Sequence, residues 1–279
     1  MCTVIVRVEP GSAWPVTLLA LRDESPDRPW DPPGAWWPER DASTRGVRDR
    51  SAGGAWLAAS DRTGALAVVL NRDEAVPEVD GGWTTRGALP LDAVIDDALP
   101  VVARTPTTRA FNLLRASADG VTVTAWDGER VTTTALAPGV HMLTEGAPDD
   151  VVVPRIGRWL PAFRAVAAPA GPPDAAGVDA AGLDAAGVAA AGASGAVTSV
   201  ARAADEHDQW GAWLRVLAET TALPNDDPQA VLRDNTGAEG RFATLSVVTA
   251  AVGAEGVALR HARLPQPGRI GEGLTLRPA

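Results

Sequence analysis

The 279-residue sequence contains no lysine and no tyrosine, only one cysteine and three histidines. A catalytic Schiff base therefore has no lysine to form it, and no phenol is available as an acid or base. Because Cys2 stands alone, neither an intrachain disulfide nor a multi-thiolate zinc site can form. His141, His207 and His261 are too far apart in sequence to make a ligand motif, so we expect no metal and no bound cofactor.

Long apolar runs and positive charge are also scarce. No stretch approaches the roughly 20 consecutive apolar residues that a membrane-spanning helix needs, and the first apolar run lacks the basic segment that precedes it in a signal peptide. The 25 basic residues face 35 acidic ones, for a net charge of −10, which argues against nucleic-acid binding. We expect a cytoplasmic protein, and the abundance of Ala, Gly and Arg is typical of GC-rich bacterial coding.

Strand patterns occupy both ends of the sequence. Hydrophobic residues make up 46% of the chain, enough for a large core. Helical spacing predicts helices at 91–99, 156–166 and 197–221, and the Pro- and Trp-rich segment 26–54 is expected to be a loop. Alternating apolar residues between turn signals predict strands at 3–8, 16–21, 55–60, 65–70, 110–115, 121–126, 130–136, 242–252 and 256–262. Strands at both ends with helices between them indicate an α+β fold.

A low-complexity segment interrupts this pattern. Pentapeptides of the form Asp-Ala-Ala-Gly followed by Val or Leu run in tandem from 174 to 188, and the sequence after them consists mainly of Ala and Gly. A five-residue period fits no helical repeat, and glycine recurs too often for a stable helix. We therefore expect one domain over 1–279, carrying a flexible insertion at about 168–196.

Cys2 is the strongest candidate for chemistry. Removal of Met1 before a small residue would give Cys2 a free α-amine, whose reference pKa of about 7.7–8.0 suits a general base near neutral pH. The thiol is the most nucleophilic side chain near neutrality. One residue at the start of a strand would then hold both a nucleophile and its base, although a buried, inert cysteine is the plainer interpretation.

Arg22 and Asp23 follow the strand that is expected to return beside Cys2. A hairpin over 3–21 would bring both side chains back to the thiol. The carboxylate could orient the α-amine, and the guanidinium could lower the pKa of the thiol. Charged residues at a strand end are more commonly solvated, so Arg22 and Asp23 support a catalytic site only in combination with Cys2.

An ordered set of short motifs is similar to the NRDE family, also called the transport and Golgi organization protein 2 family. Its members begin Met-Cys, run a hairpin into Asn-Arg-Asp-Glu and continue with Arg-Pro, Gly-Gly-Thr-Trp-Leu-Gly and a strand ending Leu-Thr-Asn. The corresponding segments are Met1-Cys2, Leu21-Arg22-Asp23-Glu24, Arg28-Pro29, Gly53-Gly54-Ala55-Trp56-Leu57 and Leu70-Asn71. Weaker matches are Thr85-Arg86-Gly87, Phe111-Asn112-Leu113-Leu114 and Ala137-Pro138-Gly139-Val140-His141. The literal tetrapeptide Asn71-Arg72-Asp73-Glu74 occupies the Leu-Thr-Asn position, not the signature position.

The family in turn resembles N-terminal cysteine hydrolases such as conjugated bile salt hydrolase and penicillin V acylase. That resemblance implies an N-terminal-nucleophile (Ntn) hydrolase-like αββα sandwich, in which two antiparallel sheets lie between outer helices. It also implies roles for four residues: Cys2 as nucleophile, Asp23 as partner of its amine, Arg22 as charge partner and Asn71 as oxyanion-hole donor. A donor of that kind is typically worth about 3–4 kcal/mol in the transition state.

Two positions depart from the family pattern. Glu145 stands where the family has an asparagine, and a carboxylate there would repel a developing oxyanion; Leu245 stands where it has an arginine. Trp36 and Trp37 lie in the Pro-rich loop, where they either line a pocket or, more commonly, pack over the sheet. With Asn112 and Glu145 they complete the candidate substrate-binding set. His141 could ligate haem, since the family has been linked to haem trafficking, but a lone histidine is more commonly a surface residue.

Three functions therefore stay open. The first is a cysteine amidohydrolase that acts on a small amide, acyl or thioester substrate. The second is a non-catalytic binding and trafficking protein for haem or an acyl-CoA-like lipid that reuses the same pocket. The third is a scaffold with a vestigial pocket. The expected partner is a small molecule, with no membrane span and no nucleic acid, and the sequence does not indicate an oligomeric state.

Overall fold

The computed structural model describes residues 1–76, 78, 80–96, 107–166, 168, 210–237, 240–270 and 274–279. The insertion expected at 168–196 therefore falls outside the described residues, apart from Ala168. So do the end of the helix expected at 91–99 and the first part of the one expected at 197–221.

The first of two antiparallel sheets contains both ends of the described chain. Its central strands are β1, β2 and β12, and short strands complete the edges. In spatial order the sheet is β10 (Gly139–Leu143), β1 (Thr3–Val8), β2 (Val16–Glu24), β12 (Gly240–Gly253), β13 (Gly256–Arg263) and β14 (Arg277–Pro278), with β11 (Asp234–Gly237) beside β12. β2 pairs with both its sequence neighbour β1 and the late strand β12, so the two ends of the sequence meet in this sheet.

The second sheet is a meander in which each strand pairs with the next one along the chain. Its order is β3 (Trp30–Gly34), β4 (Thr44–Asp49), β5 (Ala55–Ser60), β6 (Ala65–Asn71), β7 (Phe111–Ser117), β8 (Gly120–Trp126) and β9 (Val131–Ala135). Local hairpin connections explain this simple order, because short turns join antiparallel neighbours.

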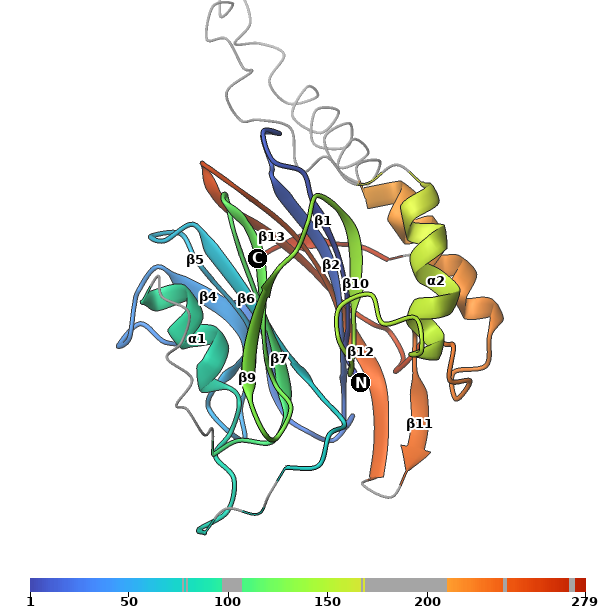
Figure 1. Ribbon diagram of the computed structural model, residues 1–279, viewed down its shortest axis with the longest axis horizontal. Helices are drawn as coiled ribbons and strands as arrows, with labels where there is room; N and C mark the ends of the chain where they lie inside the picture. Colours follow the sequence, from blue (N-terminus) through green and yellow to red (C-terminus); the bar gives the residue numbers. More distant parts are fainter. Residues whose placement is uncertain are drawn as a thin grey trace, which may run out of the picture.

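Helices cover the outer faces of the two sheets (Figure 1). α1 (Ala88–Ile95) packs on β5 and β6 of the second sheet. α2 (Pro154–Ala165) packs on β10 of the first sheet, and a helical segment at 210–219 shares a hydrophobic cluster with it. The chain thus has an α+β fold with two antiparallel sheets between helices. No helix in the described ranges is long and apolar enough to cross a membrane.

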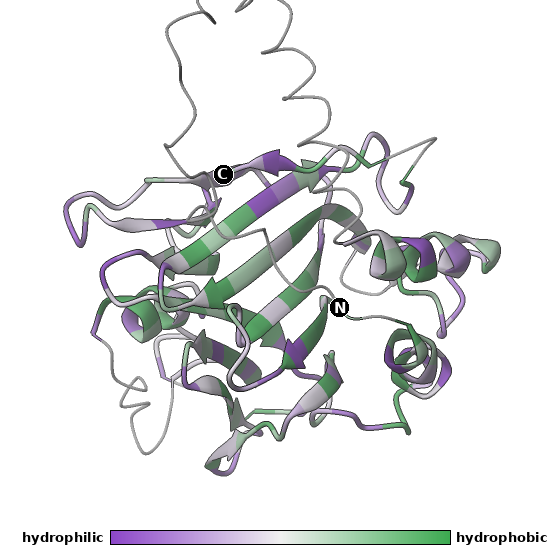
Figure 2. Cartoon of the chain, turned by 90° about the horizontal axis from the view of Figure 1, so that it is seen from above, coloured by the Kyte–Doolittle hydropathy of each residue, from purple (hydrophilic) through white to green (hydrophobic). Residues whose placement is uncertain are grey.

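The core follows from the period-two alternation of the central strands. On β1, Val4 and Val6 face the core between the sheets, whereas Ile5 faces the helices. β2 repeats the pattern, with Leu18 inward and Leu19 outward. Because both faces are covered, these strands are apolar along most of their length, as the colouring of Figure 2 shows.

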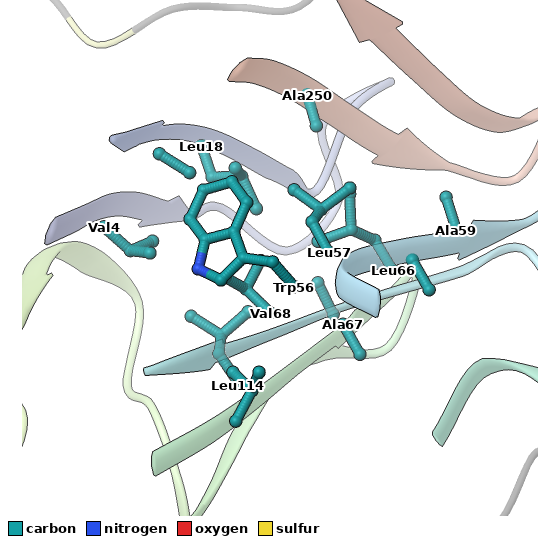
Figure 3. Close-up of a cluster of buried hydrophobic side chains, with 14 of the residues drawn as sticks. Val4, Leu18, Trp56, Leu57, Ala59, Leu66, Ala67, Val68, Leu114 and Ala250 are labelled. Atoms are coloured by element: carbon teal, nitrogen blue, oxygen red, sulfur yellow. The ribbon is translucent and has the colours of Figure 1, made fainter. Parts of the chain in front are cut away.

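Trp56 of β5 spans the space between the sheets. Figure 3 shows its indole lying between Val4 and Leu18 of the first sheet and Val68 of the second. At about 25 cal/mol per Å² of apolar surface removed from water, an aromatic side chain of this size is among the largest single contributions to the core.

The expectation of a loop over 26–54 is wrong, because this segment contains β3 and β4. Pro32 and Pro33 interrupt the strand signal, yet β3 is the edge strand of its sheet, where a missing N–H costs little. Its pairing with β4 is irregular between Asp31 and Gly34. The short strands β10 and β11 were likewise not predicted.

Candidate active site

The β1–β2 hairpin places the second residue of the chain beside the end of its partner strand. Thr3 pairs with Leu21, so the residues before Thr3 run past Arg22 and Asp23. The backbone N–H of Asp23 donates to Sγ of Cys2 at 3.4 Å, and the Asp23 carbonyl oxygen lies 3.5 Å from the same sulfur. The expected juxtaposition of Cys2 with Asp23 is therefore a feature of the hairpin register itself.

The Asp23 side chain binds the N-terminal ammonium. Its Oδ2 accepts from the amine nitrogen of Met1 at 3.2 Å, and its Oδ1 accepts from the Thr244 hydroxyl at 2.6 Å. Thr244 lies opposite Asp23 because the pairing of β2 with β12 shifts between Thr244 and Ser246. A β-bulge of this kind re-aims side chains, and here it directs the hydroxyl at the carboxylate.

Arg22 is almost fully buried, at 2% exposure. Its guanidinium lies over the ring of Trp30 at 5.4 Å and donates from Nη2 to Glu24 at 3.4 Å. Nη1 has no hydrogen-bond partner among the described residues. Burial lowers the pKa of Arg22, opposed by the Glu24 carboxylate, so this cation lies in a medium where an added anion would be bound strongly.

The Cys2 thiol is protonated near neutral pH while Met1 is present. Burial, and after it the Asp23 carboxylate, raise the pKa of Cys2 to about 11. The N-terminal ammonium and Arg22 oppose this shift but do not overcome it. A positive charge closer to the sulfur, or loss of burial, would be needed to form the thiolate near neutrality.

A cavity of about 580 Å³ opens beside Cys2. Trp56, Val69, Trp83 and Phe242 provide apolar surface, and Asn71 lines it from the end of β6. Seven charged residues also line it: Arg22, Arg28, Arg86, Arg109, Asp23, Glu24 and Asp49. The volume suits a small molecule with both apolar and charged parts.

Two glycines hold one wall of this cavity against the sheet. A Cβ on Gly54 would lie 2.5 Å from the backbone of Gly87, and one on Gly87 would lie 2.9 Å from Gly54. The Ala55 N–H donates to the Gly87 carbonyl oxygen at 2.8 Å. The two motifs that contain these glycines are therefore in backbone contact, which fixes Arg86 at the cavity wall.

Glu145 lies on the other side of the N-terminus and is paired with a cation. Its Oε1 accepts from Arg155 Nη2 at 3.2 Å, while its Oε2 is buried and meets no donor of the described residues. Arg155, the second residue of α2 after Pro154, also donates from Nη1 to the Met1 carbonyl oxygen at 2.8 Å. Glu145 does not line the cavity described above, and Leu245 is a buried core residue.

Asn71 and Asn112 lie on neighbouring strands but in different settings. Asn71 is exposed at the cavity, at the end of β6. Asn112 is fully buried, and its amide nitrogen donates to the carbonyl oxygens of Thr144 and Gly146 while its Oδ1 accepts from Arg72. Its amide thus ties β7 to the segment after β10 and does not reach the cavity.

Trp36 and Trp37 pack outside the cavity. Trp37 is buried and donates from Nε1 to the Gly53 carbonyl oxygen at 2.8 Å. Trp36 lies beneath the Arg48 guanidinium, 4.6 Å from its ring centre. Both side chains therefore pack against neighbouring residues and do not line the pocket, which is the commoner of the two arrangements considered from the sequence. The aromatic residues that do line the cavity are Trp56, Trp83 and Phe242.

His141 lies at 12% side-chain exposure on β10, away from Cys2 in the fold. Its Nδ1 contacts Asp149 Oδ2 at 2.7 Å, and its Nε2 contacts the Ala137 carbonyl oxygen at 2.8 Å. Both ring nitrogens are therefore occupied by acceptors. Within the described ranges no three His, Cys, Asp or Glu side chains gather as a metal site.

Several site residues were not singled out from the sequence. Thr244, Arg155 and Arg86 each contact the groups around the N-terminus or the cavity, although two of them are distant in sequence. Arg86 had a signal, since it belongs to the matched Thr85-Arg86-Gly87 segment, and so did Thr244, which precedes Leu245 in the Ala243-Thr244-Leu245-Ser246 segment that resembles the family's Gly-Thr-Arg-Ser. The bulge in β12 and the start of α2 position Thr244 and Arg155.

The comparison with known families agrees with these features. The sequence profile of the Transport and Golgi organisation 2 family matches residues 1–168, which contain Cys2, both matched strand pairs and the glycine motifs. The chain belongs to this family. No curated protein matches the chain significantly.

Proposed function

We propose that the protein is an N-terminal cysteine hydrolase-like enzyme that acts on a small amide, acyl or thioester substrate, with the fold of an N-terminal-nucleophile hydrolase. The observation that supports it is the double contact of Asp23. Its backbone lies against the Cys2 sulfur while its carboxylate binds the α-ammonium of Met1, and Cys2 and Asp23 both line one cavity.

Removal of Met1 is the activating step in this proposal. It converts the amide nitrogen of Cys2 into an amine on the same residue as the thiol. The ammonium that Asp23 holds would then belong to Cys2, closer to the sulfur than the Met1 amine is. A nearby positive charge lowers a thiol pKa, which opposes the burial that now raises it to about 11.

The reaction follows from these groups. Sγ of Cys2 attacks the substrate carbonyl carbon while the α-amine takes the thiol proton, forming an S–C bond. The bond to the amine or thiol leaving group breaks, and the proton passes from the α-ammonium to that group. Water then adds to the thioester with the amine as base, releasing the acid and restoring the thiol.

Stabilisation of the oxyanion falls to Asn71 and to Arg22. Asn71 lines the cavity at the end of β6, and Arg22 Nη1 is a buried donor without a partner in the part of the chain that the structure describes. Glu145 does not line the cavity and is paired with Arg155, so the expected repulsion from this carboxylate is reduced.

A second candidate is non-catalytic binding of an acyl-CoA-like ligand or haem. The aromatic and arginine lining, together with the protonated thiol, favours it. An acyl-CoA-like ligand fits better than haem, because the described lining contains no histidine and a protonated thiol is a poor iron ligand.

The test is an intact-mass spectrum of the untagged protein before and after exposure to a thiol-reactive acyl probe. Loss of Met1 and one saturable adduct at Cys2, formed faster than on the unfolded chain, are expected. The Cys2→Ala variant is the control and should give no adduct. Retained Met1, or a thiol no more reactive than in the unfolded chain, would reject the enzyme; ligand binding that survives Cys2→Ala without turnover would support the second candidate.

A further inference from the structure

The cavity beside Cys2 concentrates positive charge in a chain whose net charge is −10. Four arginines and three carboxylates line it. A cation-rich cavity in an acidic protein attracts anions locally although the protein as a whole repels them. The question is which of these cations is available to a ligand.

The three carboxylates already have cationic partners. Asp23 accepts from the N-terminal ammonium, and Asp49 binds Arg28 Nη2 at 2.6 Å. Glu24 faces Arg22 at 3.4 Å and Arg28 at 3.8 Å. Arg22 and Arg28 are therefore each paired with a carboxylate of the cavity. Arg86, in the wall formed by residues 83–87, is not paired in this way with a described carboxylate.

Arg86 presents one edge of its guanidinium to the cavity. Its Nη1 donates to the Ala110 carbonyl oxygen at 2.9 Å, and Nε and Nη2 donate to no atom of the described residues. No described carboxylate lies within ion-pair distance of it, whereas Arg109 is close enough to lower its pKa in addition to the effect of burial. A thiolate at Cys2 and the Glu24 carboxylate act in the opposite direction.

The position of this edge is fixed. Gly87 lies in backbone contact with Gly54, and the N–H of Gly87 donates to Thr85 Oγ1 at 3.2 Å. With Nη1 bound to Ala110, the remaining donors Nε and Nη2 are parallel and point the same way. That is the arrangement which binds both oxygens of a carboxylate at once.

We propose that Arg86 is the specificity-determining residue of the cavity and binds a carboxylate carried by the substrate that acylates Cys2. The substrate class is a small amide or thioester with a carboxylate on its acyl or leaving part. This inference rests on the proposed function, because it concerns the substrate of the same thiol.

The experiment compares two alkylating probes of nearly equal size, iodoacetate and iodoacetamide, on the mature protein. Each replaces its iodide with the Cys2 sulfur, so the ratio of their rates cancels changes in thiol reactivity and reports recognition of the negative charge. The wild-type ratio should exceed that of the unfolded chain. Because a hydrogen bond to a charged group is worth about 1.5–3 kcal/mol, Arg86→Gln should lower the ratio by about tenfold or more.

Arg158→Gln is the matched control. It removes the same charge from α2, where Arg158 stacks on Trp159 outside the cavity lining, and should leave the ratio unchanged. Wild-type protein also permits a test without substitution, since glutarate should slow the labelling of Cys2 by iodoacetamide and the neutral glutaramide should not.

Three results decide the matter. A raised ratio that Arg86→Gln abolishes, with protection by glutarate alone, would support the proposal. Fast labelling by iodoacetamide with an ordinary ratio, equal in Arg86→Gln and wild type, would overturn the role of Arg86 and leave the proposed function standing. Labelling by iodoacetamide no faster than on the unfolded chain would reject the proposed function, and the substrate assignment with it.

Discussion

The hydroxyl of Thr244 donates a 2.6 Å hydrogen bond to Oδ1 of Asp23, the carboxylate whose other oxygen binds the N-terminal ammonium. The two residues are 221 positions apart in the sequence. The same hydroxyl oxygen accepts from the Arg233 N–H at 2.9 Å, so one side chain joins β12, β2 and the segment before β11. The Thr244 hydroxyl thereby fixes one oxygen of the Asp23 carboxylate while the other oxygen binds the N-terminal amine.

Thr244→Val should therefore destabilise the protein and disturb the site. The change removes a donor to a buried carboxylate, and hydrogen bonds to charged groups contribute about 1.5–3 kcal/mol to stability. Urea unfolding would measure the loss. Thr249→Val is the matched control, because Thr249 is a buried threonine of the same strand whose hydroxyl has no partner within the described ranges, and its replacement should be neutral or slightly stabilising. Equal losses in the two variants would contradict the role assigned to Thr244.

Gly54→Ala should displace the cavity wall. An added Cβ would meet the Gly87 backbone at 2.5 Å, and overpacking of this kind typically costs about 1–3 kcal/mol. The free energy of unfolding should fall, and the labelling of Cys2 by small thiol reagents should change with it. Gly237→Ala is the control, since nothing lies within 4 Å of a Cβ there. A Gly54→Ala variant as stable as Gly237→Ala would show that the contact can relax freely.

Protein that retains Met1 should lose stability in alkali. Burial raises the pKa of Cys2 from 9.0 to about 11, so the folded state keeps the thiol proton where the unfolded chain has lost it. This contribution is complete below pH 9 and disappears as the pH rises toward 11. Chemical unfolding across this range, with Cys2→Ser as the control that lacks the titration, measures it. Indistinguishable pH profiles of the two proteins would be inconsistent with the buried thiol.

His141 and His261 should have opposite effects on stability as the pH changes. The hydrogen bond to Asp149 raises the pKa of His141, so its contribution is complete below pH 6.5 and is lost as the pH rises through the folded-state value. Burial and Arg263 lower the pKa of His261 to about 4, so its contribution is lost as the pH falls from 6.5 toward 4. NMR titration of the two imidazoles checks both directions. His141→Gln should remove only the first effect.

The sequence predicted those parts of the fold that depend on local patterns. The hairpin of β1 and β2 was expected because β-branched residues alternate around a Pro-Gly turn, and its register brings Cys2 to Asp23. The β5–β6 hairpin and the final strand pair were expected on the same grounds. By contrast, β3 was hidden by Pro32 and Pro33, which only an edge position tolerates, and edge position is a property of the whole sheet.

The candidate site shows the same division. Arg22 and Asp23 could be selected because they follow a predicted strand, Asn71 was selected through the family resemblance, and all three line the cavity. Trp36 and Trp37 were selected for their chemistry alone, and their direction depends on β3 and β4, which were not predicted. The contact of Thr244 with Asp23 could not be predicted, since it depends on a bulge that displaces one residue of β12.

The position of the first residue has a practical consequence for anyone who prepares this protein. Met1 is held at both ends of its backbone, by Asp23 at its nitrogen and by Arg155 at its carbonyl oxygen. An affinity tag fused ahead of it would replace the ammonium with a peptide bond and keep the Cys2 nitrogen acylated. Under the proposed function, an assay on such a fusion would report an inert protein, so purification should begin from an unmodified start or from a protease that cuts directly before Cys2.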